Sequence, residues 1–133
     1  MDCLADTHAS VWYLFAAPEL SAVAKNFMDM AAASGGLIFV PTISIIEIVY
    51  LTEKGKLLPQ TLPRLIQVVN LPNSSFSFIE LNSGIAQTLS QIPRSTVPDM
   101  PDRIIAATAL HLSLPLVTKD RKIQALQSIQ TIW

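Results

Sequence analysis

Five short apolar runs, separated by stretches long enough for helices, limit most strongly how this chain can fold. They lie at residues 2–6, 37–41, 76–81, 114–118 and 129–133. The run LIFVP at 37–41 is continuous and favours β-structure, which is typical of a strand buried on both faces. Strands that alternate with helices form a parallel sheet covered on both sides, joined by right-handed crossovers. We therefore predict an α/β fold, a three-layer α/β/α sandwich with a parallel central sheet.

The segments between these runs carry helix signals. Ser21 is placed to cap a helix that ends at Gly35-Gly36, and Pro18 and Gly55 mark the ends of two others. Pro101 suits the first turn of a helix that runs to residue 113. The spacing of apolar residues predicts helices over 8–17, 22–34, 44–56, 61–70, 84–92, 101–113 and 121–127.

Composition restricts the class of protein. With 133 residues and no repeat or long linker, the chain is predicted to form a single domain over 1–133. Half of the residues are apolar and 14% are charged, which excludes disorder. Cys3 is the only cysteine, so an internal disulfide and a cysteine-based zinc site are excluded.

Two features bear on where the protein is expected to act. The N-terminus has an acid at position 2 and no basic region, so we do not expect a signal peptide. The most apolar stretch, 37–51, is interrupted by Pro41 and Glu47 and is a poor membrane span. A cytoplasmic protein with no membrane association is expected.

Acidic residues follow the predicted strands. Asp6 comes directly after the first strand, Asp120 directly after the fourth, and Glu47 lies early in the helix after the second. Parallel strands deliver their carboxyl ends to one edge of the sheet, so these three acids should converge there. Asp102 opens the helix that leads into the fourth strand and makes a fourth acid if that helix starts at the same edge.

Each acid also has a purely structural interpretation. Ser44 and Glu47 have the spacing of a capping box, which alone would explain Glu47. Asp102 is favoured near a helix N-terminus by the helix dipole, and Asp99 could be the N-cap itself. Asp120 could start a turn.

The set of acids together favours a metal. Four clustered carboxylates repel one another by roughly 1 kcal/mol per pair at about 4 Å in water, and by more when partly buried. A hard divalent cation that binds oxygen ligands offsets this repulsion. The formal net charge is −1 and there is no basic tail, but the remainder of the protein is positive if the acids lie under metal. Nucleic acid therefore stays open as a partner.

The histidines and large aromatic residues carry weaker signals. His8 lies two positions after the first acid, where it could reach the site or could pack against or cap the first helix. His111, in the middle of a predicted helix, is expected to be structural. Trp12, Tyr50 and Trp133 are expected in the core or an interface rather than as platforms for stacked bases.

Several segments, in this order, resemble the PIN domain family, and specifically its VapC-type toxin ribonucleases. They are LADTHASVW (4–12), SIIEIVYL (44–51), PDRIIAATAL (101–110), LPLVTKDRKI (114–123) and TIW at the end of the chain. The resemblance implies a PIN-like parallel sandwich, an acidic pocket that binds Mg²⁺ or Mn²⁺, RNA cleavage, and neutralisation by a cognate antitoxin protein. It also supports a homodimer. Ala5 is smaller than the aliphatic residue expected before the first acid, which affects packing only.

The resemblance assigns roles by position. Asp6, Glu47, Asp102 and Asp120 match the acidic quartet and would be the catalytic metal ligands. Thr118 matches a hydroxylic residue beside the last acid, and Asp99 is expected to support the site as a cap or an outer contact. The expected chemistry is metal-assisted hydrolysis of a phosphodiester. Candidate RNA-binding residues, for which a solvated surface is an equal alternative, are Arg103, Lys119, Arg121 and Lys122.

Two other classes of function stay open at this stage. A receiver-type phosphoacceptor domain shares the parallel sheet and the first acid, but needs an acceptor Asp after the third strand, where this chain has LNSG. A non-catalytic PIN-like interaction module would have the same fold. The apolar content further predicts self-association and a groove for a partner segment, formed by the helices that carry Trp12, Phe15, Tyr50 and Leu51.

Overall fold

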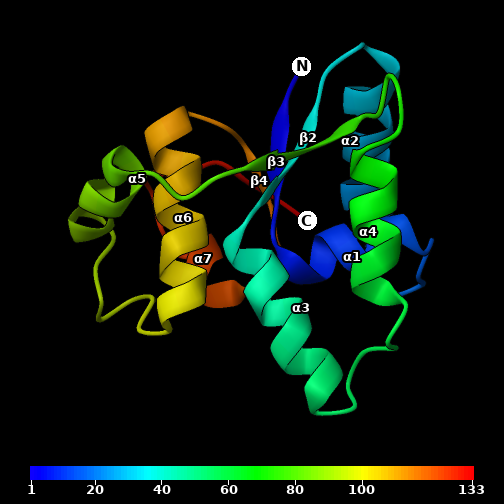
Figure 1. The fold of residues 1–133 in the computed structure, drawn as a ribbon. Helices are drawn as coiled ribbons and strands as arrows, with labels where there is room; N and C mark the ends of the chain where they lie inside the picture. The colour runs from blue at the N-terminus through cyan, green and yellow to red at the C-terminus, as the bar shows by residue number, and fades with distance from the viewer.

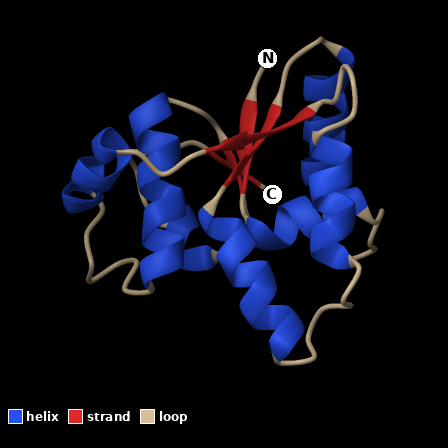
Figure 2. Ribbon diagram, viewed as in Figure 1, coloured by secondary structure: helices blue, strands red, loops and turns tan.

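The central sheet has five parallel strands in the order β3-β2-β1-β4-β5. This computed structural model describes all 133 residues. The strands are β1 (Cys3–Ala5), β2 (Ile38–Pro41), β3 (Phe76–Ile79), β4 (Leu116–Val117) and β5 (Thr131–Ile132). The predicted α/β/α sandwich with a parallel sheet is confirmed (Figures 1 and 2).

Seven α-helices and one 3₁₀ turn fill the segments between the strands, close to the predicted positions. They are α1 (Thr7–Leu14), α2 (Ala22–Ala33), α3 (Ile43–Glu53), α4 (Thr61–Val69), α5 (Ser83–Thr88), η1 (Leu89–Gln91), α6 (Met100–Leu112) and α7 (Arg121–Gln124). None of these helices is long and apolar enough to cross a membrane.

The two faces of the sheet bury separate cores. Along β1, Cys3 and Ala5 point into one core and Leu4 into the other, as the alternation of side chains along a strand requires. The first core is closed by α1, α2 and α4, and the second by α5, α6 and α7 (Figure 1). Ala106, Ala107 and Ala109 on α6 are fully or almost fully buried, so their small size lets α6 lie close to the sheet.

Local signals explain most helix boundaries. Ser21 accepts a hydrogen bond from the backbone N of Ala24 at 3.0 Å and so caps α2 as predicted. The first helix was expected to reach residue 17 but ends at Leu14, and Ala16 then takes a left-handed conformation with φ 51°. Pro18 therefore lies beyond the end of the helix.

The structure does not form the capping box that was the alternative interpretation of Ser44 and Glu47. The cap position of α3 is Thr42, which makes no capping hydrogen bond with its side chain, and Ser44 lies inside the helix and fully buried. Glu47 consequently lies beyond the first turn, and its carboxylate is free to take part in contacts with α1.

The strand order reverses direction between β1 and β4. The chain moves outward from β1 through β2 to β3, then crosses back to β4 and continues to β5. In open parallel sheets the crevice at such a reversal, at the carboxyl ends of the strands, is the usual place for a ligand. Asp6 follows β1, and Asp120 lies between β4 and α7, so these two acids flank the crevice.

Candidate active site

A cavity of about 630 Å³ opens at the carboxyl ends of β1 and β4 and collects all the predicted acids. Its walls come from the starts of α1, α6 and α7 and from one face of α3. The acids in its lining are Asp6, Glu47, Asp99, Asp102 and Asp120, and the other residues are Thr7, His8, Trp12, Ile105, Lys119 and Arg121. Segments distant in sequence therefore meet at one edge of the sheet, as the strand pattern predicts.

Asp6 is fixed at the end of β1 by three groups. Its backbone N donates to the carbonyl oxygen of Val117 at 3.1 Å, which continues the pairing of β1 with β4. Its carboxylate caps α1, because Oδ1 accepts from the backbone N of Ala9 at 2.9 Å. The Thr118 hydroxyl donates to Oδ2 at 2.5 Å. The position of the Asp6 carboxylate is thus set by both central strands.

Thr118 connects the first acid with the last. It is fully buried, and besides donating to Asp6 its hydroxyl oxygen accepts from the backbone N of Asp120 at 3.0 Å. Asp120 caps α7 through Oδ1, which accepts from the backbone N of Lys122 and of Ile123. Both cap bonds use the same oxygen, which leaves Oδ2 available for another partner.

Glu47 is positioned by the hydroxyl of Thr7, which the sequence did not single out, and Thr7 in turn contacts the buried hydroxyl of Ser44. Thr7 donates from Oγ1 to Glu47 Oε1 at 2.5 Å, and Thr7 Oγ1 lies 2.8 Å from Ser44 Oγ. Thr7 and Ser44 are 3% and 0% exposed, so neither hydroxyl can exchange its partner for water. The signal was present in the sequence, since Thr7 directly follows Asp6 and Ser44 lies one helical turn before Glu47.

Asp99 and Asp102 have different geometry. Asp99 is the N-cap of α6, with extended backbone, and its Oδ2 accepts from the backbone N of Asp102 at 3.2 Å. Asp102 lies inside the first turn, directly after Pro101, and is half-buried at the cavity wall. The predicted cap role of Asp99 is confirmed, and its carboxylate also lines the cavity.

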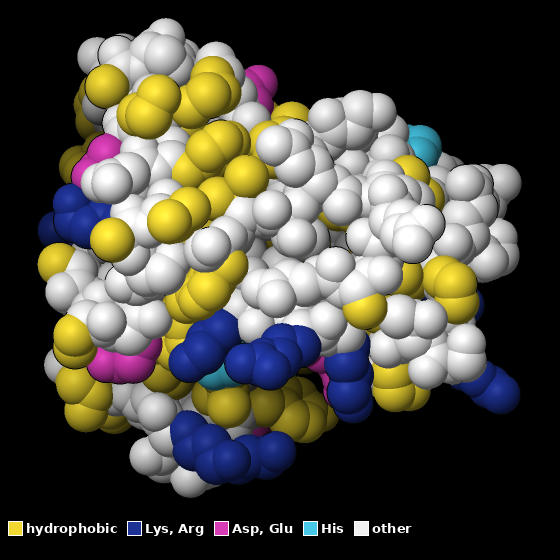
Figure 3. Space-filling view, turned by 180° about the vertical axis from the view of Figure 1, so that it is seen from behind, with side chains coloured by type: hydrophobic (Ala, Val, Ile, Leu, Met, Phe, Trp, Pro, Cys, Tyr) yellow, Lys and Arg dark blue, Asp and Glu magenta, His cyan; other side chains and the backbone are white.

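The basic residues around the cavity are fewer than the four proposed from sequence. Lys119 and Arg121 line it, whereas Lys122 and Arg103 do not. Arg103 instead donates from Nε to the carbonyl oxygen of Ile92 at 2.8 Å, which ties α6 to the segment after η1. Seen from behind, Lys and Arg side chains gather around a hollow that also contains histidine and hydrophobic side chains (Figure 3).

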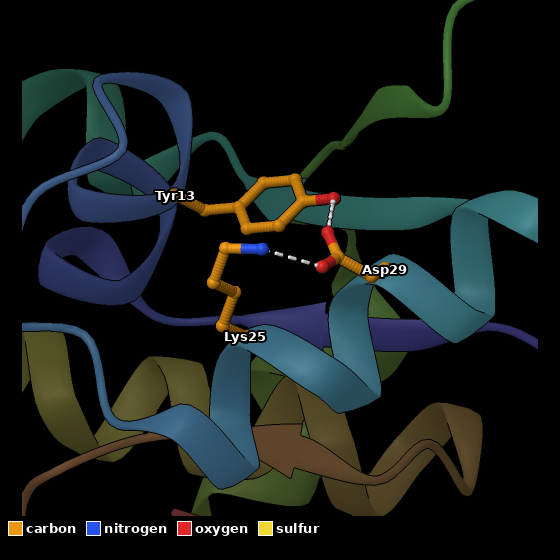
Figure 4. Close-up of polar contacts among 3 residues, drawn as sticks. All are labelled: Tyr13, Lys25 and Asp29. Atoms are coloured by element: carbon orange, nitrogen blue, oxygen red, sulfur yellow. Dashed lines mark hydrogen bonds and ion pairs between the residues drawn. The ribbon is translucent and has the colours of Figure 1, made fainter.

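The cavity acids have no cationic partner. The single ion pair of the protein lies elsewhere, between Lys25 Nζ and Asp29 Oδ2 at 2.7 Å, where Tyr13 also donates to Asp29 Oδ1 at 2.7 Å (Figure 4). In the cavity, burial and the nearby charges of Asp120, Asp99 and Glu47 raise the pKa of Asp102 from its ordinary 3.8 to about 7. Negative charge is therefore concentrated here with no ion pair to neutralise it.

The other two acids of the quartet with resolved shifts behave in the same way. Burial raises the pKa of Asp6, although the hydrogen bonds from Thr118 and Ala9 oppose the shift. Burial also raises the pKa of Glu47, opposed by the hydrogen bond from Thr7. Both carboxylates are held in fixed positions by donors while their charged forms are disfavoured by burial.

The chemistry of the donor set fits a hard divalent cation. The cavity offers carboxylate oxygens from the ends of β1 and β4 and from α3 and α6, the ligand type that Mg²⁺ and Mn²⁺ take. A cation there would remove the repulsion that raises the pKa of Asp102. As the side chains are placed, no three acidic, histidine or cysteine residues form a ready group of metal ligands.

A second, more apolar groove of about 330 Å³ adjoins the acidic cavity. His8 and Trp12 line both spaces. The groove runs between α1, α3 and the segment before α4, and it includes Phe15 and Leu51, which the sequence placed in a partner groove. Its remaining lining residues are Val11, Ala17, Glu19, Lys56, Leu57, Leu58 and Thr61.

The chain is similar to known proteins over almost its whole length. Residues 3–128 match the family model described as PIN domain. Ribonuclease VapC22 of Mycobacterium tuberculosis is 28% identical over 122 residues, which cover 92% of this chain and 89% of that protein.

Solved structures show the same fold. VapBC2 from Rickettsia felis, solved bound to a DNA fragment from their promoter, aligns with a TM-score of 0.73 at 17% identity, covering 98% of this chain and 97% of that one. VapBC-1 from nontypeable Haemophilus influenzae aligns with a TM-score of 0.69 at 14% identity, covering 98% and 96%. At these identities the structural likeness bears on the fold alone.

Proposed function

The chain belongs to the PIN domain family, and from this premise we propose that it is a metal-dependent endoribonuclease, the toxin of a toxin–antitoxin pair. The observation that carries the proposal is the assembly of Asp6, Glu47, Asp102 and Asp120 around one cavity with no ion-pair partner. The similar Ribonuclease VapC22 and the VapBC structures support the activity and the antitoxin partner.

The proposed roles of the residues follow from their positions. Asp6, Glu47, Asp102 and Asp120 would hold Mg²⁺ or Mn²⁺. Such an ion supplies a water of lowered pKa and stabilises the charge that develops on the phosphate.

The surrounding side chains complete the site. Thr118 holds Asp6 in place, and Thr7 holds Glu47. Asp99 supports Asp102 by accepting a hydrogen bond from the backbone N of Asp102. Lys119 and Arg121 on the cavity wall would attract the phosphate backbone of RNA.

The alternative of a receiver-type phosphoacceptor has no support in the structure. The residues that follow β3 do not line the cavity, and Asn82 in that segment caps α5 by accepting from the backbone N of Ile85 at 2.9 Å. A non-catalytic PIN-like module would not explain the unpaired carboxylates, because burial of unpaired charges costs free energy.

The nuclease proposal is tested by incubating the purified protein with mixed RNA in Mg²⁺ or Mn²⁺ and in a chelator. We expect cleavage only with metal, and no cleavage by Asp6→Asn. Asparagine caps helices as well as aspartate does, so α1 should stay intact, which circular dichroism checks. Cleavage by Asp6→Asn at the rate of the parent protein would show that the site is wrong.

We further propose that the protein forms a homodimer and that the apolar groove takes a segment of the antitoxin. Ile46, Val49 and Tyr50 lie on one side of α3 and are 53%, 37% and 60% exposed, so they offer an apolar surface to a second copy of the chain. Sedimentation measures the self-association, and co-purification with the antitoxin measures the second contact. A stable monomer at high concentration would contradict the dimer.

A further inference from the structure

The acidic cavity and the apolar groove are neighbours that share Trp12 and His8 in their walls, and we call the two spaces together the cleft. Both residues line both spaces. Trp12 and Asp6 belong to the same rigid unit, because Asp6 caps α1 and Trp12 lies on that helix. The indole is therefore held at a fixed place relative to the first acid.

The surroundings of Trp12 leave part of its ring accessible. The side chain is half-buried and packs against the core, with the Trp133 ring centroid at 6.0 Å. His8 is exposed, and its ring lies 5.2 Å from that of Trp12 at an angle of 45°. Lys119 Nζ lies 5.8 Å from the centre of the Trp12 ring. An aromatic surface with a cation beside it thus borders the acidic cavity.

The charges along the cleft select among possible occupants. Lys56 lines the groove, and Lys119 and Arg121 line the cavity. None of them is in an ion pair, since the one ion pair of the protein joins Lys25 and Asp29. Single-stranded nucleic acids bind to grooves that hold both cations and aromatic rings, with phosphates on the cations and bases on the rings.

We propose that Trp12 is the platform on which a base stacks beside the acidic cavity, displacing the Lys119 side chain that lies over its ring. This inference rests on the proposed nuclease function and adds to it a residue that positions the RNA beside the acidic cavity. A base inside a duplex is already stacked on its neighbours and has no free face to offer. The sequence alone predicts Trp12 in the core or an interface, and one part of its surface does pack against the first core.

The test measures binding rather than turnover. Asp102→Asn blocks cleavage, and a chelator removes metal. In that background Trp133→Phe leaves Trp12 as the only tryptophan, so its fluorescence reports directly on the platform. The probes are a short unpaired RNA, the same RNA with an abasic residue at its centre, and the matching blunt duplex.

We expect the unpaired RNA to quench Trp12 and the duplex to bind more weakly. Trp12→Leu, which keeps an apolar side chain without a ring, should weaken binding of the unpaired RNA roughly fivefold to a hundredfold, whereas Trp12→Phe should retain most of it. The abasic RNA should bind the parent protein as weakly as the intact RNA binds Trp12→Leu. Binding of the abasic RNA to Trp12→Leu should be only slightly weaker than either. A role in packing alone would not distinguish the abasic from the intact strand.

Two results would overturn the inference. The first is equal affinity for intact and abasic RNA, while the protein with Asp102 intact still cleaves RNA in the presence of metal. This result would contradict the role of Trp12 and leave the nuclease proposal unaffected. The second is a change in Trp12 fluorescence on addition of an antitoxin segment but not of any RNA. This result would mean that Trp12 binds the protein partner instead. If neither RNA binding nor cleavage is observed, both proposals fail.

Discussion

The acidic cavity and the cluster of Tyr13, Lys25 and Asp29 shift the pKa of an aspartate side chain in opposite directions. Hydrogen bonds from Lys25 and Tyr13 lower the pKa of Asp29, which lies at the surface between α1 and α2. Burial and neighbouring acids raise the pKa of Asp102 to about 7.

Asp29 meets its partners within the fold, whereas the charge at Asp102 is left for something outside the chain to neutralise. Unpaired, clustered carboxylates therefore indicate a functional site more strongly than paired carboxylates do. Paired carboxylates such as Asp29 contribute to the stability of the fold.

The largest expected effect is the loss of cleavage in Asp102→Asn. We expect RNA cleavage to fall by at least about a hundredfold and Mn²⁺ affinity to weaken, because the substitution removes one of the four proposed metal ligands. Asp29→Asn is the matched control, the same substitution at a paired carboxylate, and should cleave at the parent rate. Equal activity in the two variants would contradict the assignment of the cavity.

Replacing Thr7 tests whether the hydroxyl pair positions Glu47. Thr7→Val keeps the shape of the side chain but removes the donor to Glu47 Oε1, so cleavage and Mn²⁺ affinity should each fall about tenfold. Thr7→Ser keeps the hydroxyl and should retain most activity. A fall in thermal stability with unchanged Mn²⁺ affinity would mean that Thr7 only stabilises the fold.

The contributions of Asp102 and Asp29 to the stability of the metal-free protein should depend on pH in opposite ways. The folded-state pKa of Asp102, about 7, lies above its ordinary 3.8, so its favourable contribution is complete below about pH 4 and is lost as pH rises through 7. At pH 8 in chelator, Asp102→Asn should therefore be more stable than the parent by about 1 kcal/mol, after allowing for solvent screening.

Asp29 should show the reverse sign. Its pKa is lowered, so its contribution is present at neutral pH and is lost on acidification. Asp29→Asn should be slightly less stable than the parent at pH 8, by less than about 1 kcal/mol, because the pair is exposed. Urea unfolding at pH 5 and pH 8 measures both, and a gain for Asp29→Asn with a loss for Asp102→Asn would reverse the comparison.

The smallest effect is expected for Asp99→Asn. Asparagine still caps α6, and removal of the charge lessens the repulsion on Asp102 without removing an inner ligand. Cleavage should stay within about threefold of the parent, and Mn²⁺ titration should give a similar affinity. A loss as large as that of Asp102→Asn would make Asp99 a ligand as well.

Helix and strand order were predictable because local signals agree with the tertiary fold. The apolar runs became the five strands, and Ser21, Asp99 and Pro101 took the predicted positions at helix starts. Boundaries were less predictable where no residue fixes them. The first helix ends at Leu14 rather than at 17, since the backbone turn at Ala16 leaves no strong trace in sequence.

The convergence of Asp6, Glu47, Asp102 and Asp120 on one cavity was also predictable, because parallel strands deliver their ends to a single edge. The basic residues were not, since charge next to an acid in sequence does not say which way a side chain points. Lys119 and Arg121 reach the cavity, whereas Arg103 turns to the carbonyl oxygen of Ile92.

By itself the sequence determined the alternation of strands and helices, the parallel sheet and the acids at its carboxyl edge, because these depend on periodicity and on neighbours along the chain. Only the tertiary structure decided that Thr7 and Ser44 position Glu47, and that Trp12 joins the acidic cavity to the apolar groove. Those contacts depend on how α1 and α3 pack against each other across about forty residues of chain, and no local pattern records that distance.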